Sequence, residues 1–172
     1  MSTATVTRDA RALLLPEDFE AVTATVLDNN PGLRRGVAER IIEQALAFVA
    51  TAADAKEAMA PSRVVDEGWH ALILHTRLYE ALCRRLGRFV HHAPERPEST
   101  RDSYGPDWLT RTADAIAAAG FQIDADLWRG PEDDTIQVRA PAQHSPGPNC
   151  APIVTHPEPK KASPAPFPTG TV

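Results

Sequence analysis

The sequence predicts an all-α protein, a small bundle of about four helices followed by a disordered Pro-rich C-terminal tail. Apolar residues recur at helical spacing between Leu13 and Trp128, and proline and glycine separate the periodic stretches. No stretch shows the alternation of apolar and polar residues that is typical of a strand. We therefore expect a flexible leader at residues 1–12, a helical domain at 13–129 and the tail at 130–172.

Proline and glycine delimit the first two predicted helices. Pro16 and the two acidic residues after it predict a helix start, because proline fits the first turn and acidic groups favour the positive end of the helix dipole. The asparagine, proline and glycine residues at 29–32 end this helix. A second, amphipathic helix is expected from residue 33 to about residue 59, where Pro61 follows.

Two more helices complete the predicted bundle. The third is expected from about residue 63 to residue 86, with Ser62 as its N-cap and Gly87 as its stop. The fourth is expected to begin at residues 105–107 and to end at Gly120. The apolar residues that follow it are expected to fold back over the bundle, namely Phe121, Ile123, Leu127 and Trp128.

From Gly130 onward the composition changes. Proline recurs throughout this part and large apolar side chains are few, so the segment cannot bury enough surface to offset the entropy of ordering. We expect a disordered, stiff tail, which could tether a protein partner.

Charge and hydropathy argue against two classes of partner, nucleic acids and membranes. The formal net charge is -5, which argues against nucleic acid because a phosphate backbone requires a basic face. No apolar run reaches the roughly 18 to 20 residues that span a bilayer, and no secretory signal is visible at the N-terminus. Two cysteines make no disulfide framework, so we expect a cytoplasmic protein.

One short segment concentrates the residues that are suited to chemistry. It contains four of the six histidines and one of the two cysteines, namely His70, His75, His91, His92 and Cys83. Imidazole is the commonest metal ligand in proteins and titrates near neutral pH. The sequence therefore predicts the functional site here, although the catalytic residues and the reaction stay unknown.

Helical geometry leaves two arrangements open. At about 100° per residue, Asp66 and His70 lie one turn apart on one face of a helix. His91 or His92 could then complete a metal site by folding back from the following loop, with the carboxylate as a ligand or as a partner of an imidazole. In the second arrangement His75, which is the weaker ligand candidate, shares the opposite face with Tyr79 and Cys83.

Each of these residues also has a purely structural interpretation. His75, Tyr79 and Cys83 share their face with leucines and could simply belong to the core. Asp66 and His70 could form an intrahelical hydrogen bond that closes the first turn. We keep Trp69, Tyr79 and Cys83 as further pocket candidates.

The motif in this segment resembles a known family. Asp66 followed by Trp69-His70, then Tyr79, Gly87 and a histidine at 91 or 92, is similar to the Asp-x-x-Trp-His core of the glycine-rich domain-containing-protein-like family. The resemblance covers about a third of the chain and implies a largely helical fold. Two departures limit what it implies: Leu72 occupies the position of a second histidine, and a proline-rich tail replaces the glycine-rich region.

Two functions remain in competition. The first is a metal-binding helical protein, which holds zinc or iron at His70 and one of His91 and His92, with Asp66 or His75 as a further candidate ligand, and which could support a hydrolytic or oxidative reaction. The second is a non-catalytic interaction module that presents tryptophans as anchors and uses the tail as a tether. These tryptophans are Trp69, Trp108 and Trp128.

Overall fold

A computed structural model describes residues 7–57, 59–92, 107–130 and 133–138. Within these residues five α-helices and one 3-10 turn form, and the only pairing of strand type is an isolated bridge between Arg8 and Phe121. The prediction of an all-α fold is confirmed. None of the helices in the described part has the length and apolar character that crossing a membrane requires. In chain order the elements are η1 (Arg11–Leu13), α1 (Pro16–Asn29), α2 (Arg35–Asp54), α3 (Arg63–Leu74), α4 (Thr76–Leu86) and α5 (Trp108–Ala118).

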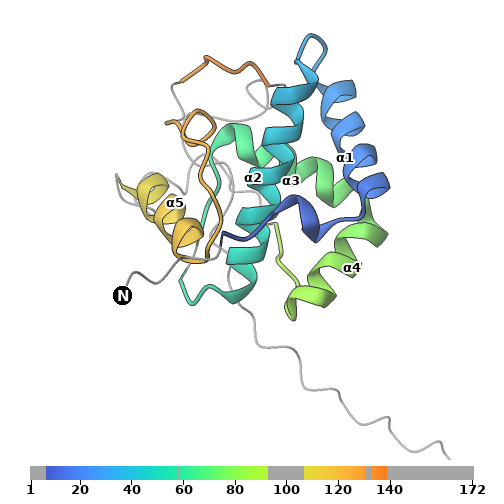
Figure 1. Ribbon diagram of the computed structural model, residues 1–172. Helices are drawn as coiled ribbons and strands as arrows, with labels where there is room; N and C mark the ends of the chain where they lie inside the picture. Colours follow the sequence, from blue (N-terminus) through green and yellow to red (C-terminus); the bar gives the residue numbers. More distant parts are fainter. Residues whose placement is uncertain (1–6, 58, 93–106, 131–132, 139–172) are drawn as a thin grey trace, which may run out of the picture.

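Helix α2 forms the centre of the fold. It packs against α1, α3, α4 and α5, and Figure 1 shows it between α5 on one side and α1 on the other. Most of its residues from Ala38 to Ala53 are buried, which is unusual for an amphipathic helix and follows from its having neighbours on several sides. The hydrophobic core is therefore built around α2.

The predicted starts and stops of three helices are confirmed. Helix α1 begins at Pro16, as the proline signal indicated. Ser62 caps α3, because its hydroxyl accepts a hydrogen bond from the Val65 amide at 3.2 Å. Gly87 follows α4 with φ of 84°, the left-handed conformation in which glycine is favoured.

The second predicted helix is shorter than expected. It ends at Asp54 rather than near Met59, although no residue between them is a helix breaker. Met59 and Ala60 are buried outside any helix, so tertiary packing decides the conformation of this segment.

The predicted single helix from residue 63 to residue 86 is wrong, because the structure divides it at His75. The backbone of His75 has φ of -86° and ψ of 65°, outside the helical region. Its ring Nε2 lies 2.8 Å from the hydroxyl oxygen of Thr25 on α1. This tertiary contact accompanies a change of direction between α3 and α4. No proline or glycine near His75 indicates this change in the sequence.

The segment after α5 folds back over the bundle, as predicted. Phe121 and Leu127 are buried in the main core. The side-chain amide of Gln44 donates to the Gln122 carbonyl at 3.0 Å and accepts from the Trp128 indole at 2.7 Å, so α2 holds this segment by hydrogen bonds as well as by packing.

The proposed domain boundaries stay predictions. Val138, which the sequence analysis assigned to the tail, is buried in the core, and Arg8 of the predicted leader bonds to the Ala119 carbonyl. Residues 1–6 of the leader and residues 139–172 of the predicted disordered tail lie outside the described part of the chain.

A close contact between α2 and α3 depends on Gly68. A Cβ atom at this position would lie 2.9 Å from the Ile41 carbonyl oxygen, the Ile41 Cγ2 and the Ala45 Cβ. These distances are shorter than real Cβ contacts and one of the atoms is backbone, so a side chain would force the helices apart. Gly68 thus sets how closely the helix of the histidine motif approaches the core.

We expect Gly68→Ala to lower the free energy of unfolding. Overpacking costs about 1–3 kcal/mol, which outweighs the roughly 1 kcal/mol that alanine gains over glycine in a helix. Gly36→Ala, at an exposed position in the first turn of α2, is the matched control, since its Cβ would meet nothing within 4 Å and stability should be unchanged or slightly higher. Urea denaturation followed by circular dichroism measures both, and equal stability of the two variants would contradict the close-packing account.

Candidate metal site

Helix α3 positions the first two residues of the site. Asp66 lies in its first turn, where the positive end of the helix dipole favours a carboxylate, and His70 follows one turn later. The Asp66 side chain is 3 % exposed and the His70 side chain 33 %, with 3.6 Å between Asp66 Oδ2 and His70 Nε2. A buried acid thus faces a histidine that solvent can reach.

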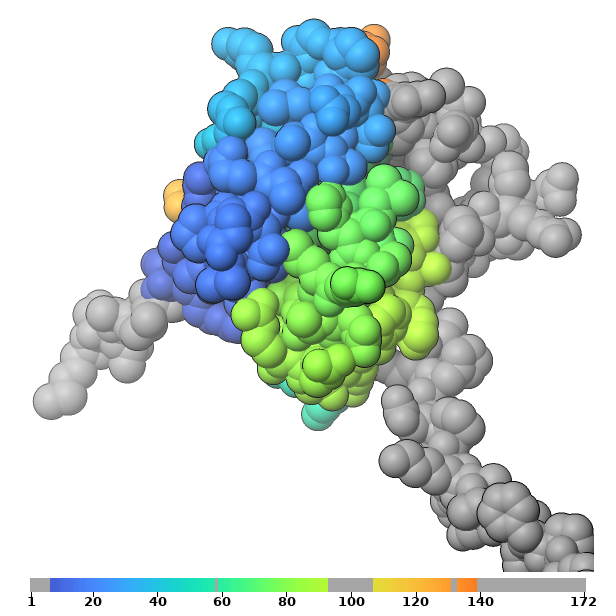
Figure 2. Space-filling model, turned by 90° about the vertical axis from the view of Figure 1, so that its right-hand side faces the viewer, coloured from blue at the N-terminus to red at the C-terminus, as the bar shows by residue number. Residues whose placement is uncertain are grey.

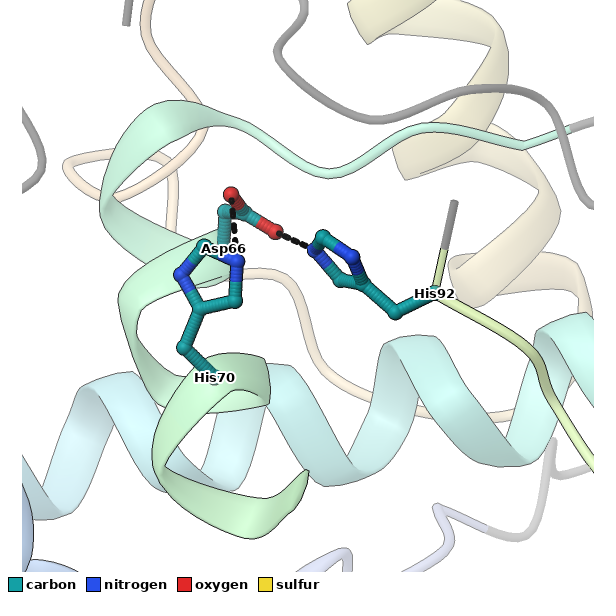
Figure 3. A group of neighbouring side chains, drawn as sticks. All are labelled: Asp66, His70 and His92. Atoms are coloured by element: carbon teal, nitrogen blue, oxygen red, sulfur yellow. Dashed lines mark hydrogen bonds and ion pairs between the residues drawn. The ribbon is translucent and has the colours of Figure 1, made fainter. Parts of the chain in front are cut away.

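The third residue, His92, comes from the segment that follows α4. Its Nε2 lies 3.3 Å from Asp66 Oδ1, and its side chain is 11 % exposed. The rings of His70 and His92 have centroids 4.5 Å apart. Figure 3 shows the result: the Asp66 carboxylate lies between the two imidazoles and turns one oxygen toward each.

The three side chains have the spacing of a potential metal site. One ligand atom from each lies within 4.8 Å of the other two. A tetrahedral zinc ion with bonds of about 2.0–2.2 Å separates its ligands by roughly 3.4 Å, so shifts of about 1 Å would close the group on an ion. Two imidazole nitrogens and a carboxylate oxygen suit zinc and ferrous iron alike.

Trp69 and Tyr79 connect this group to the protein interior. The Trp69 indole donates a hydrogen bond to the Tyr79 hydroxyl at 2.8 Å, and that hydroxyl donates to the Val90 carbonyl at 2.5 Å. The Trp69 ring also lies against the His92 ring, with centroids 4.6 Å apart. Burial raises the pKa of Tyr79 well above its usual value, so the phenol keeps its proton.

Two of the predicted histidine candidates do not join the group. His91 is exposed and packs against the Phe89 ring, at 4.7 Å between centroids. His75 lies at the junction of α3 and α4, where it bonds to Thr25. Among the described residues, the ligand-type side chains that converge are Asp66, His70 and His92.

Cys83 belongs to the core rather than to the group around Asp66. Burial raises the pKa of its thiol, although hydrogen bonds with the Val90 backbone and with Tyr79 act in the opposite direction. A thiol with a raised pKa forms little thiolate, which is the form that reacts and that binds metals.

Sequence reasoning missed the hydrogen bond by which Tyr79 holds the Val90 backbone, two residues before His92. Tyr79 and the two histidines after Val90 were named as candidates, but the hydrogen bond from Tyr79 to the Val90 carbonyl depends on the direction of α4 after the break at His75. No motif carries that information, because a backbone carbonyl is present at every position. The one available signal was the apolar pair Phe89 and Val90 directly before the two histidines.

We expect Cys83 to be nearly inert in the folded protein. In a Cys150→Ser variant, which leaves one thiol, modification by a chromogenic disulfide at mildly alkaline pH should be more than about tenfold slower than in the same variant denatured in guanidinium chloride, because the native thiol is buried and its pKa is raised. Equal rates in the two states would show that Cys83 is accessible and would reopen its candidacy as a ligand.

Comparison with known proteins corrects the resemblance suggested by the motif. The chain matches the UCP032817-like family over residues 16–104, just over half of its length, and no glycine-rich domain-containing-protein family is indicated. The Asp-x-x-Trp-His spacing is too short a pattern to identify a family by itself. Neither a curated protein nor a solved structure matches the chain. The region matched contains Asp66, His70 and His92, and the chain belongs to the UCP032817-like family.

Proposed function

We propose that this protein binds one divalent metal ion, zinc or ferrous iron, through Asp66, His70 and His92. The observation that carries the proposal is the convergence of these three side chains from two separate segments, with the carboxylate between the imidazoles. An intrahelical contact of Asp66 with His70 would not require a second histidine from another segment. The arrangement therefore favours a ligand set over a helix-closing hydrogen bond.

The burial of the carboxylate supports the same conclusion. A carboxylate removed from water needs hydrogen-bond donors or a cation near it. A metal ion is the most concentrated positive charge that could occupy this position, and neutral imidazoles are then free to be ligands. The Asp66 side chain would bind the ion directly or orient an imidazole that does.

Three protein ligands leave coordination positions open. Structural zinc sites are closed by four protein side chains, whereas catalytic sites keep a position for water or substrate. Iron sites of two histidines and one carboxylate are likewise open. Because His70 is partly exposed, solvent has access to this side of the group. We accordingly propose a site that can activate water or bind a small oxygen-containing ligand when the ion is present.

The alternative of a tryptophan-anchored interaction module gains no support from the described residues. Trp69 and Trp108 are buried, and the Trp128 indole is bonded to Gln44. Hot-spot anchors need exposure in the free protein. A tail that binds a partner and a cytoplasmic location stay predictions, since residues 139–172 lie outside the described part of the chain.

The proposal is tested by metal titration of protein purified without a histidine tag. We expect one zinc or ferrous ion per chain, measured by elemental analysis and by anaerobic calorimetry, together with a rise in melting temperature. Asp66→Asn, His70→Ala and His92→Ala should each weaken binding by more than about 100-fold, because even residues that only support a ligand change affinity by 10–100-fold. Affinity should also fall at acidic pH, where imidazoles must lose a proton to bind.

His91→Ala is the matched control, because it removes an imidazole one residue away that faces solvent. Its affinity should equal that of the unaltered protein. Substoichiometric metal with no thermal stabilisation would contradict the proposed function. Equal losses of metal affinity in the His91 and His92 variants would contradict it as well.

A further inference from the structure

Of the three side chains in the group, His92 is the one whose position is least constrained by its own segment. Asp66 and His70 are fixed by the hydrogen bonds of α3, whereas His92 lies in an irregular stretch six residues beyond the end of α4 at Leu86. A side chain on such a stretch needs contacts from elsewhere to keep one position. The question is which contacts hold it beside Asp66.

Tyr79 holds the backbone two residues before His92. Val90 is fully buried, and its carbonyl accepts a hydrogen bond from the Tyr79 hydroxyl at 2.5 Å. The ring of Phe89 meets the Tyr79 ring edge-on, with centroids 5.4 Å apart. Tyr79 thus contacts two consecutive residues of the segment that leads to His92.

The Tyr79 hydroxyl is itself held in place by Trp69. The indole N–H donates to the hydroxyl oxygen, which directs the hydroxyl hydrogen to the Val90 carbonyl. Trp69 is fully buried and packs on Phe48 of α2, at 5.0 Å between centroids. Its ring also lies against the His92 ring. The rigid Trp69 indole therefore contacts both the Tyr79 hydroxyl, which bonds to the Val90 carbonyl, and the His92 ring.

We propose that Tyr79 is a positioning residue of the metal site: its hydroxyl, oriented by Trp69, fixes the Val90 carbonyl and so sets His92 Nε2 beside Asp66. The effect on metal affinity rests on the function proposed above. The placement of His92 does not, because it concerns the metal-free protein. Tyr79 does not bind the ion in this account, since its hydroxyl is engaged with Trp69 and Val90.

The test is Tyr79→Phe, which removes one oxygen and keeps the ring. In the metal-free unaltered protein we expect nuclear Overhauser contacts between the ring protons of His92 and Trp69, and His92 resonances shifted by the indole ring current. In Tyr79→Phe these contacts should be lost and the resonances should move toward those of exposed His91. Unchanged contacts and shifts in a folded variant would overturn the proposal.

Two further variants distinguish a positioning role of the Tyr79 hydroxyl from a general disturbance of the fold. Thr25→Val is the matched control, because it removes a hydroxyl bonded to another histidine, His75, and should leave the His92 resonances unchanged. Replacement of Tyr79 by 4-aminophenylalanine restores a donor at the same place and should restore the contacts. If Thr25→Val has the same effect as Tyr79→Phe, or if the amino variant fails to restore the contacts, the specific role of this hydroxyl is wrong.

A measurement on the unaltered protein covers the case in which Tyr79→Phe does not fold. The Tyr79 hydroxyl proton should exchange slowly with solvent and show Overhauser contacts to Val90 and to the Trp69 indole proton. A rapidly exchanging hydroxyl without these contacts would overturn the proposal without any substitution.

Cobalt binding then connects positioning to function. With Co²⁺ as the probe, Tyr79→Phe should bind about 10–100-fold more weakly, as expected for a residue that orients a ligand. Its visible spectrum at saturation should resemble that of His92→Ala, while Thr25→Val retains the original spectrum. Displaced His92 resonances with unaltered cobalt affinity would overturn the role in metal binding. If the unaltered protein binds no cobalt, zinc or iron, the proposed function fails, whereas the resonance measurements still decide the placement of His92.

Discussion

The burial of the Asp66 carboxylate is the constraint around which the rest of the site is arranged. An ionised acid loses most of its hydration when it enters the interior, and this loss must be offset by nearby positive charge or donors. The first turn of α3 supplies the positive end of a helix dipole, and His70 and His92 each bring a ring nitrogen to one carboxylate oxygen. The contacts that stabilise the buried acid thus also bring together two nitrogens and one oxygen that could hold a metal ion.

The helical architecture brings this arrangement about through two features of packing. The lack of a side chain at Gly68 lets α3 approach α2 closely, which carries Asp66 into the interior. The break at His75 then turns α4, and Tyr79 reaches back to Trp69 and to the backbone before His92. A straight helix would have kept Tyr79 on the face opposite Asp66. The change of direction therefore allows residues ten or more positions apart to serve one site.

Local signals in the sequence predicted much of the fold, and they predicted that Asp66 and His70 share one helix face. Proline at position 16, the Ser62 cap and the Gly87 stop act through their own backbone chemistry, so their effects are visible without the rest of the chain. The spacing of Asp66 and His70 is equally local. By contrast, the break at His75 lies beside a contact with another helix, and the position of His92 rather than His91 beside Asp66 depends on the path of the backbone after α4. Long-range packing of this kind leaves no short pattern.

The most direct test of the central claim is anomalous diffraction at the zinc edge from crystals of the zinc-loaded, untagged protein. The account predicts a single strong anomalous peak among an Asp66 oxygen and the Nε2 atoms of His70 and His92, with bonds of about 2.0–2.2 Å. It also predicts His91 pointing away from the ion. A zinc ion bound elsewhere on the chain, with the three side chains unmoved and no density between them, would contradict it.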